Sequence, residues 1–195
     1  SQVMGDTITN FWRDANHPRG IWRQSPLGAY LAGTPEWTTL IDVDALGKAE
    51  GQSWVWHGAD CLAPTYTRCL VSLSPGGTDS DVVREWDRTT GRFVTDGFAL
   101  PQAKSAVVWE DADTLLVATD YGEGSMTASG YPRIVKRWRR GTPLASAAVV
   151  AEGEASDVGI NPIAIDDGKT RWILIARNKS FYTSDYSIRA ADGAG

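Results

Sequence analysis

The segment from Arg68 to Val94 constrains the fold of this chain more than any other part of it. Three short strand-like runs and two turns follow one another there, in the order Arg68–Ser74, Pro75–Thr78, Val82–Asp87, Thr89–Gly91 and Arg92–Val94. Glycine and proline favour chain reversals in the turns, and strands joined in this way pair as an antiparallel meander. A meander that recurs along a chain predicts a β-propeller or a β-sandwich rather than an α/β enzyme with a pocket.

The meander does recur. The run Val82-Val-Arg-Glu-Trp86 resembles Ile134-Val-Lys-Arg-Trp138, about 50 residues further on, and one more step of that length reaches Tyr186. Three apolar runs have a comparable spacing: Leu70–Leu73, Leu115–Ala118 and Ile173–Ala176. A four-stranded propeller blade takes roughly 40 to 50 residues. We therefore predict an all-β fold, a partial β-propeller of about four consecutive four-stranded antiparallel blades.

The predicted blades span residues 1–60, 61–103, 104–155 and 156–195, and the last of them is short enough to be incomplete. Outside the meander, the strand candidates are residues 7–13, 20–24, 38–43, 105–109, 114–119, 133–139, 147–152, 171–176 and 182–189. Helical character is confined to Asp42–Glu50, where Asp42 or Asp44 would be the N-cap. The longest loop, Tyr121–Pro132, is either a functional segment or a surface loop without a role.

The composition is that of one globular domain with a sizeable core, because 42% of the 195 residues are hydrophobic and 22% are charged. The net charge of −5 does not favour binding to nucleic acid or to an anionic membrane, since both are negatively charged. No apolar run approaches the roughly 20 residues that a membrane-spanning helix needs. Tryptophans recur at blade positions, which favours packing between blades over ligand stacking: Trp86, Trp109, Trp138 and Trp172.

The two cysteines, Cys61 and Cys69, do not make a disulfide framework. Cys69 lies within a strand run and is predicted to be a small buried hydrophobic residue, while a Cys61–Cys69 bridge stays an alternative without support. No signal peptide is visible at the start of the sequence. We therefore expect a cytoplasmic protein, with a periplasmic or secreted one as the alternative if a signal peptide was removed.

The sequence offers no hydrolytic machinery. A hydrolase nucleophile of the α/β type needs a Gly-x-Ser-x-Gly turn, and the nearest string, Gly51-Gln-Ser53-Trp-Val55, places bulky residues where small ones are required. Both histidines, His17 and His57, lie near the start of the chain and are predicted to be structural. We predict no catalytic residue in this chain.

Metal and phosphate sites are not predicted either. Asp42-Val-Asp44-Ala-Leu46 begins like a calcium-binding loop but has leucine where an oxygen ligand is required. The basic run Lys136–Arg140 lies on a predicted strand, where alternate side chains face opposite ways, so a solvated outer strand explains it. We therefore predict no metal-binding or cofactor-binding residue and no cofactor.

Several long strings of the chain, in order, resemble the start of the propeller of bacterial prolyl-oligopeptidase-family serine peptidases. The strings are Asn10–Arg23, Thr39–Leu46, Ser53–Trp56, Cys69–Gly77, Val83–Asp87 and Gly124–Pro143. The resemblance covers residue 10 to about residue 150 and implies a segment of a seven-bladed propeller. In that family the propeller is followed by an α/β-hydrolase domain that carries the catalytic Ser, Asp and His.

The resemblance implies that this chain belongs to the gate of a peptidase, which admits short peptides and excludes folded proteins. The implied partners are a downstream α/β-hydrolase domain and, through the whole enzyme, a peptide substrate. We expect the chain alone to be inactive and to self-associate, since a partial propeller exposes apolar blade faces. One alternative is a stand-alone propeller-like interaction module. Another is a sugar or ligand binder, but the sequence contains no polar cluster that supports it.

Overall fold

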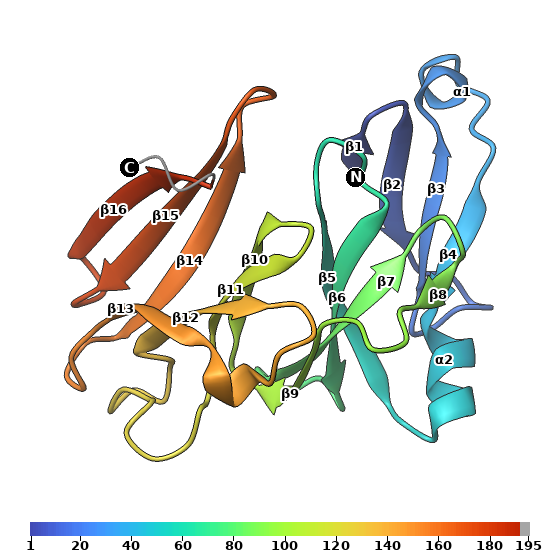
Figure 1. The fold of residues 1–195 in the computed structure, drawn as a ribbon. Helices are drawn as coiled ribbons and strands as arrows, with labels where there is room; N and C mark the ends of the chain where they lie inside the picture. Colours follow the sequence, from blue (N-terminus) through green and yellow to red (C-terminus); the bar gives the residue numbers. More distant parts are fainter. Residues whose placement is uncertain (192–195) are drawn as a thin grey trace. The chain divides into compact units, whose positions relative to one another are not determined.

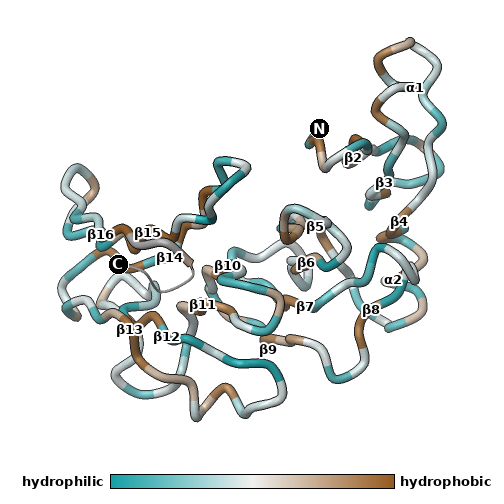
Figure 2. The backbone as a smooth tube through the Cα atoms, turned by 45° about the horizontal axis from the view of Figure 1, so that its top comes forward, coloured by the Kyte–Doolittle hydropathy of each residue, from teal (hydrophilic) through white to brown (hydrophobic). Residues whose placement is uncertain are grey.

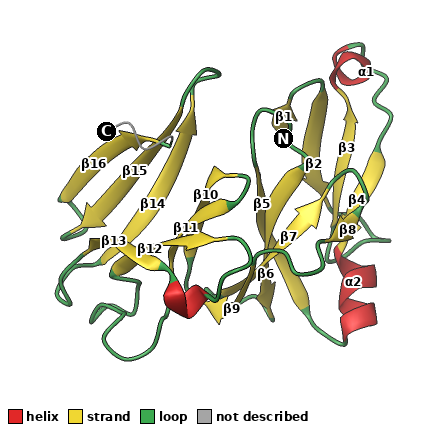
Figure 3. Cartoon of the chain, in the orientation of Figure 1, coloured by secondary structure: helices red, strands yellow, loops and turns green. Residues whose placement is uncertain are grey.

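The computed structural model describes residues 1–191, without the side chains of residues 189 and 190. Contacts within the chain divide it into two compact units, one from Ser1 to Gln102 and one from Ala103 onwards. Each unit consists of antiparallel sheets with little helix (Figures 1 and 3). No helix of the described residues is long and apolar enough to cross a bilayer, and the hydrophobic stretches in Figure 2 are short.

The first unit contains two sheets. The strands of the first sheet follow one another in chain order: β1 (Gln2–Met4), β2 (Thr7–Trp12), β3 (Ile21–Pro26) and β4 (Thr38–Asp42). The second sheet is formed by β5 (Trp54–Cys61), β6 (Arg68–Pro75), β7 (Asp81–Asp87) and β8 (Arg92–Phe93), and β9 (Ala99–Ala103) also pairs with β7. Helix α1 (Leu27–Leu31) follows β3, and helix α2 (Val43–Glu50) connects the two sheets.

The two sheets of the first unit pack face to face on one apolar core. Its buried residues come from both sheets and from the start of α2: Met4, Trp22, Ile41, Val43, Trp54, Cys61, Cys69, Val71, Leu73 and Trp86. Phe11 and Trp56 are partly buried against this core, with their rings stacked at 5.3 Å between centroids. Burial of these side chains supplies the main driving force that holds the sheets together.

The second unit also contains two sheets. One is formed by β10 (Ala106–Asp111), β11 (Thr114–Ala118), β12 (Ile134–Arg139) and β13 (Ala148–Glu152), with the short 3-10 helix η1 (Leu144–Ser146) before β13. The other is formed by β14 (Gly159–Asp166), β15 (Arg171–Asn178) and β16 (Ser184–Ala190). Their shared core consists of Leu116, Ala118, Val135, Ile160, Ile173 and Ile175.

The repeat read from the sequence is confirmed at equivalent strands. Trp86, Trp138 and Tyr186 lie on β7, β12 and β16, each of which is the third strand along its sheet. The three apolar runs lie on β6, β11 and β15, each of which is the second strand. The predicted helix is also present, because α2 begins after Asp42, whose Oδ1 accepts a hydrogen bond from the Ala45 amide at 2.9 Å.

Three details of the prediction are corrected. The limit between residues 60 and 61 falls inside β5, which pairs with β6, so the second sheet begins at Trp54. The second sheet has five strands rather than four, whereas the last described sheet has three, in line with the prediction that the last blade is short. Cys69 is not a free buried thiol, because it forms a disulfide with Cys61, directly opposite it across the β5–β6 ladder.

Candidate functional site

The two histidines each contact an aspartate. His17 Nδ1 lies 2.9 Å from Asp14 Oδ1, and this hydrogen bond is the main reason that the pKa of Asp14 is below its usual value. His57 Nδ1 lies 2.6 Å from Asp81 Oδ1, and burial raises the pKa of Asp81 in spite of the histidine. The hydroxyl of Ser53 accepts a hydrogen bond from Arg19 instead, at 2.7 Å. Ser53, His17 and His57 therefore bind other partners than one another in these contacts.

The two aspartates at the start of α2 accept hydrogen bonds from backbone amides. Asp42 caps α2, and Asp44 Oδ2 accepts from the amides of Arg19 and Gly20 at 2.9 and 3.3 Å. Asp44 therefore joins α2 to the turn before β3. Within the described residues, no group of three or more acidic, histidine or cysteine side chains is arranged to hold a metal ion.

Three of the four cations in the basic run Lys136–Arg140 contact neighbouring groups. Arg137 Nε lies 2.7 Å from Glu110 Oε2, and Arg140 Nε lies 2.9 Å from Asp113 Oδ1. The ammonium of Lys136 lies 4.2 Å from the centre of the Tyr121 ring. These contacts bind the strand to its own unit, which suits a structural role better than an anion site.

The long loop from Tyr121 to Pro132 is held by its own hydrogen bonds. The buried Ser125 is the centre of this network, because its hydroxyl contacts Asp120 Oδ1, the Gly122 carbonyl and the Tyr121 amide. At the far end Thr127 donates to the Val158 carbonyl at 3.1 Å. The loop is therefore an ordered connection that ties β11 to the segment before β14.

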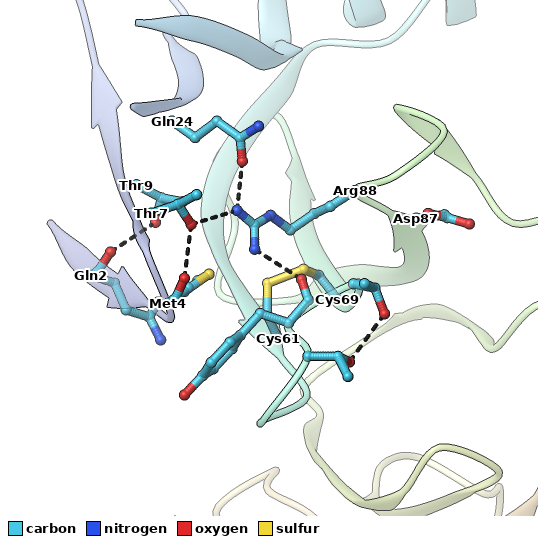
Figure 4. Close-up of a disulfide and its surroundings, with 12 residues drawn as sticks. Gln2, Met4, Thr7, Thr9, Gln24, Cys61, Cys69, Asp87 and Arg88 are labelled. Atoms are coloured by element: carbon cyan, nitrogen blue, oxygen red, sulfur yellow. Dashed lines mark hydrogen bonds between the residues drawn. A yellow bond between two sulfur atoms is a disulfide. The ribbon is translucent and has the colours of Figure 1, made fainter. Parts of the chain in front are cut away.

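The most developed polar site of the first unit is centred on Arg88, which follows β7 (Figure 4). Its guanidinium donates to the Tyr66 carbonyl at 2.9 Å, to Thr7 Oγ1 at 3.0 Å and to Gln24 Oε1 at 2.5 Å. Thr7 and Gln24 lie in strands of the first sheet, whereas Arg88 and Tyr66 lie in connections between strands of the second. Arg88 is therefore a clamp between two neighbouring sheets, which we call the Arg88 clamp.

The guanidinium is well suited to this clamp. Burial lowers the pKa of Arg88, but its ordinary pKa is so high that the group stays charged at neutral pH. Hydrogen bonds from a charged donor are stronger than those between neutral groups. Arg88 was not predicted as a site residue, and its only signal in the sequence is an arginine directly after a predicted strand.

The Cys61–Cys69 disulfide lies next to the Arg88 clamp (Figure 4). It closes the turn of residues 62–68, in which the Leu62 amide donates to the Arg68 carbonyl at 2.9 Å. The same turn provides two acceptors for Arg88, the carbonyl of Tyr66 for its side chain and that of Thr67 for its amide. Disulfide and clamp are thus joined through one short turn.

One face of the last sheet in the second unit is largely apolar, and part of it is exposed. Ile163, Leu174 and Ile188 form one cross-strand row of this face. The exposed fraction is 64% for both Tyr186 and Ile188. The opposite face contributes Ile173 and Ile175 to the core. An exposed apolar sheet face of this kind is typical of an interaction surface.

Comparison with known proteins identifies the family. A family profile described as prolyl oligopeptidase, N-terminal beta-propeller domain, matches residues 3–193. The chain belongs to the prolyl oligopeptidase family. Membership confirms both the resemblance read from the sequence and the assignment of the sheets as propeller blades.

Several relatives match most of this chain but only a part of their own length. An uncharacterized peptidase, y4nA of Sinorhizobium fredii, is 42% identical over 167 residues, which are 86% of this chain and 23% of the relative. The structure of a post-proline cleaving enzyme from Rickettsia typhi has a TM-score of 0.86 at 26% identity, covering 96% of this chain and 30% of that one. An uncharacterized peptidase, RP174 of Rickettsia prowazekii, is 30% identical over 191 residues. The chain thus spans less than a third of the length of these prolyl oligopeptidase relatives.

Proposed function

We propose that this chain is the gating segment of a prolyl-oligopeptidase-type serine peptidase, which admits short peptides and excludes folded proteins. The observation that carries the proposal is the match of residues 3–193 to the N-terminal propeller of that family. The Rickettsia typhi protein of similar structure is a post-proline cleaving enzyme. The matches lend no support to a stand-alone interaction module.

The proposed partner is an α/β-hydrolase domain of the same polypeptide. The relatives are three to four times longer than the region they share with this chain, which leaves ample length for a catalytic domain. This chain has no Gly-x-Ser-x-Gly turn of its own. The proposed reaction therefore depends on residues beyond 1–195, and the propeller contributes size selection.

The isolated chain should not react as a serine hydrolase. A fluorophosphonate probe should leave it unlabelled under conditions that label an authentic serine peptidase, because no activated serine is available. Stoichiometric labelling of Ser53 or any other serine would contradict the proposal.

The gating role is tested with the full-length protein and a version that lacks residues 1–195. Both are given a short proline-containing peptide and a folded protein that carries the same sequence. We expect the full-length protein to cleave only the peptide and the shortened version, if active, to lose this selectivity. Equal selectivity in an active shortened version would refute a gate in this segment.

We also propose that the isolated chain self-associates through its uncovered apolar face. Covering exposed isoleucine and tyrosine side chains removes apolar surface from water, which stabilises an assembly. Sedimentation velocity should show a dimer or larger species that Ile188→Glu converts to monomer. The matched control is Val3→Glu, which adds the same charge at an exposed residue of the first unit. A clean monomer at high concentration would count against the proposal.

A further inference from the structure

The Arg88 clamp and the disulfide contact the same turn, residues 62–68 (Figure 4). The disulfide holds the ends of the turn together, and Arg88 takes two carbonyl acceptors from within it, at 2.9 and 2.8 Å. The guanidinium then reaches Thr7 and Gln24 of the first sheet. The conformation of the turn therefore determines where the guanidinium can sit.

We propose that the Cys61–Cys69 disulfide is a redox-responsive lock on the joint between the first two sheets. With the bond intact, the turn presents its carbonyls to Arg88, and Arg88 holds the first sheet. When the bond is broken, the acceptors are no longer held in place. The hydrogen bonds from Arg88 to the first sheet then weaken, and β2 and β3 loosen.

The reductant is a dithiol. One of its thiolates attacks a sulfur of the disulfide, the bond between Cys61 and Cys69 breaks, and a mixed disulfide forms. The second thiol of the reductant then displaces the remaining cysteine. Two electrons and two protons pass to the protein, which holds two thiols, while the reductant becomes a cyclic disulfide.

The turn depends on its closure because its own bonds are few. Besides the Leu62–Arg68 bond, the Tyr66 amide donates to the Leu62 carbonyl at 2.8 Å. Tyr66 also has a φ of 52°, a left-handed conformation that is unfavourable for a residue with a side chain. An open chain relaxes from that conformation, and the carbonyl that Arg88 uses turns away as it does.

Burial of the sulfurs makes the lock slow. Cys69 is fully buried and Cys61 is 4% exposed, so a reductant reaches the bond only when the ends of β5 and β6 open locally. The lock therefore responds to a sustained change of redox conditions. An oxidising compartment keeps it closed.

Hydrogen exchange measured by mass spectrometry tests the lock, with the chain in the presence and absence of dithiothreitol. Reduction should raise exchange about threefold or more in the 62–68 turn and also in β2 and β3. Arg88→Ala should raise exchange in β2 and β3 with the disulfide intact, and reduction should then add little there. Arg88→Lys keeps the charge but loses the planar set of guanidinium donors. Exchange in its β2 and β3 should therefore lie between that of the unchanged chain and that of Arg88→Ala. Strands β11 and β15 of the second unit are the internal control and should not change.

Three results would overturn the lock. Reduction could change exchange in the turn alone, leaving β2 and β3 as they were. Reduction and Arg88→Ala could act independently, so that their effects on β2 and β3 add in full. Finally, alkylation without reductant could label both cysteines of the folded chain, which would show that the bond does not form. A Cys61→Ala/Cys69→Ala variant that exchanges like the reduced protein would support the lock, because it reproduces the loss of the bond without the reductant.

Discussion

Gly20, directly before β3, is the position at which we expect the smallest substitution to have the largest effect. A Cβ atom placed there would lie 2.3 Å from Phe11 Cζ and 2.7 Å from Phe11 Cε1. Phe11 cannot easily move away, because its ring is stacked on Trp56 with only 7° between the planes. Gly20 also has a φ of +99°, a conformation that side chains disfavour. Gly20→Ala therefore combines a steric clash with backbone strain.

The magnitude follows from these two contributions. Backbone strain of this kind costs about 1–3 kcal/mol, and overpacking of a core costs about as much again. We expect Gly20→Ala to lower the free energy of unfolding of the first unit by about 2–5 kcal/mol. For a unit of this size the melting temperature would fall by about 10–30 °C, measured by calorimetry or circular dichroism.

A control and a rescue separate the two contributions. Gly33→Ala has a similar φ of +76° but no atom within 4 Å of the new Cβ, so it should cost only the strain, about 1–2 kcal/mol. Phe11→Leu removes the clashing ring atoms, and in that background Gly20→Ala should cost no more than Gly33→Ala. If Gly20→Ala melts like Gly33→Ala in the otherwise unchanged chain, the reasoning from the Phe11 contact is refuted.

Two further substitutions test the polar contacts. The pKa of Asp157 is lowered chiefly by its hydrogen bond with Arg177, at 2.6 Å, so its stabilising contribution is present above about pH 4 and is lost as the pH falls through the lowered pKa. The urea concentration at the unfolding midpoint should therefore fall less between pH 5 and pH 2 for Asp157→Asn than for the unchanged chain. An equal fall in the two proteins would contradict this expectation. Asp42→Ala removes the N-cap of α2 and should lower the free energy of unfolding by about 1 kcal/mol in urea titrations, with Asp42→Asn as the control that retains a capping side chain. Equal effects of the two Asp42 variants would show that the cap bond is not responsible.

The strands that could be predicted from the sequence are those with regular apolar patterns and clear turns. The strands that were missed have local features that conceal them. Pro162 interrupts β14, which tolerates it because β14 is an edge strand of its sheet. Gly58 and a register shift interrupt β5, so its alternation is not visible in the sequence.

The site residues show the same division. The lack of a Gly-x-Ser-x-Gly turn and the family resemblance could both be recognised in the sequence, because they depend on residues that are neighbours along the chain. The disulfide could not, because Cys61 and Cys69 face one another only once β5 is recognised as the partner of β6. Arg88 could not either, since its acceptors Thr7 and Gln24 are far away in the sequence.

By itself the sequence determined the class of fold, the recurrence of the blades and the family, because local periodicity and ordered strings of residues carry that information. Only the tertiary structure decided which strands share a sheet, which cysteines meet and which arginine joins two sheets. The physical reason is that pairing register and long-range hydrogen bonds depend on how separate segments pack. The Arg68–Val94 meander could therefore be predicted from the sequence. The Arg88 clamp could not, because only the folded chain places Arg88 against the first sheet.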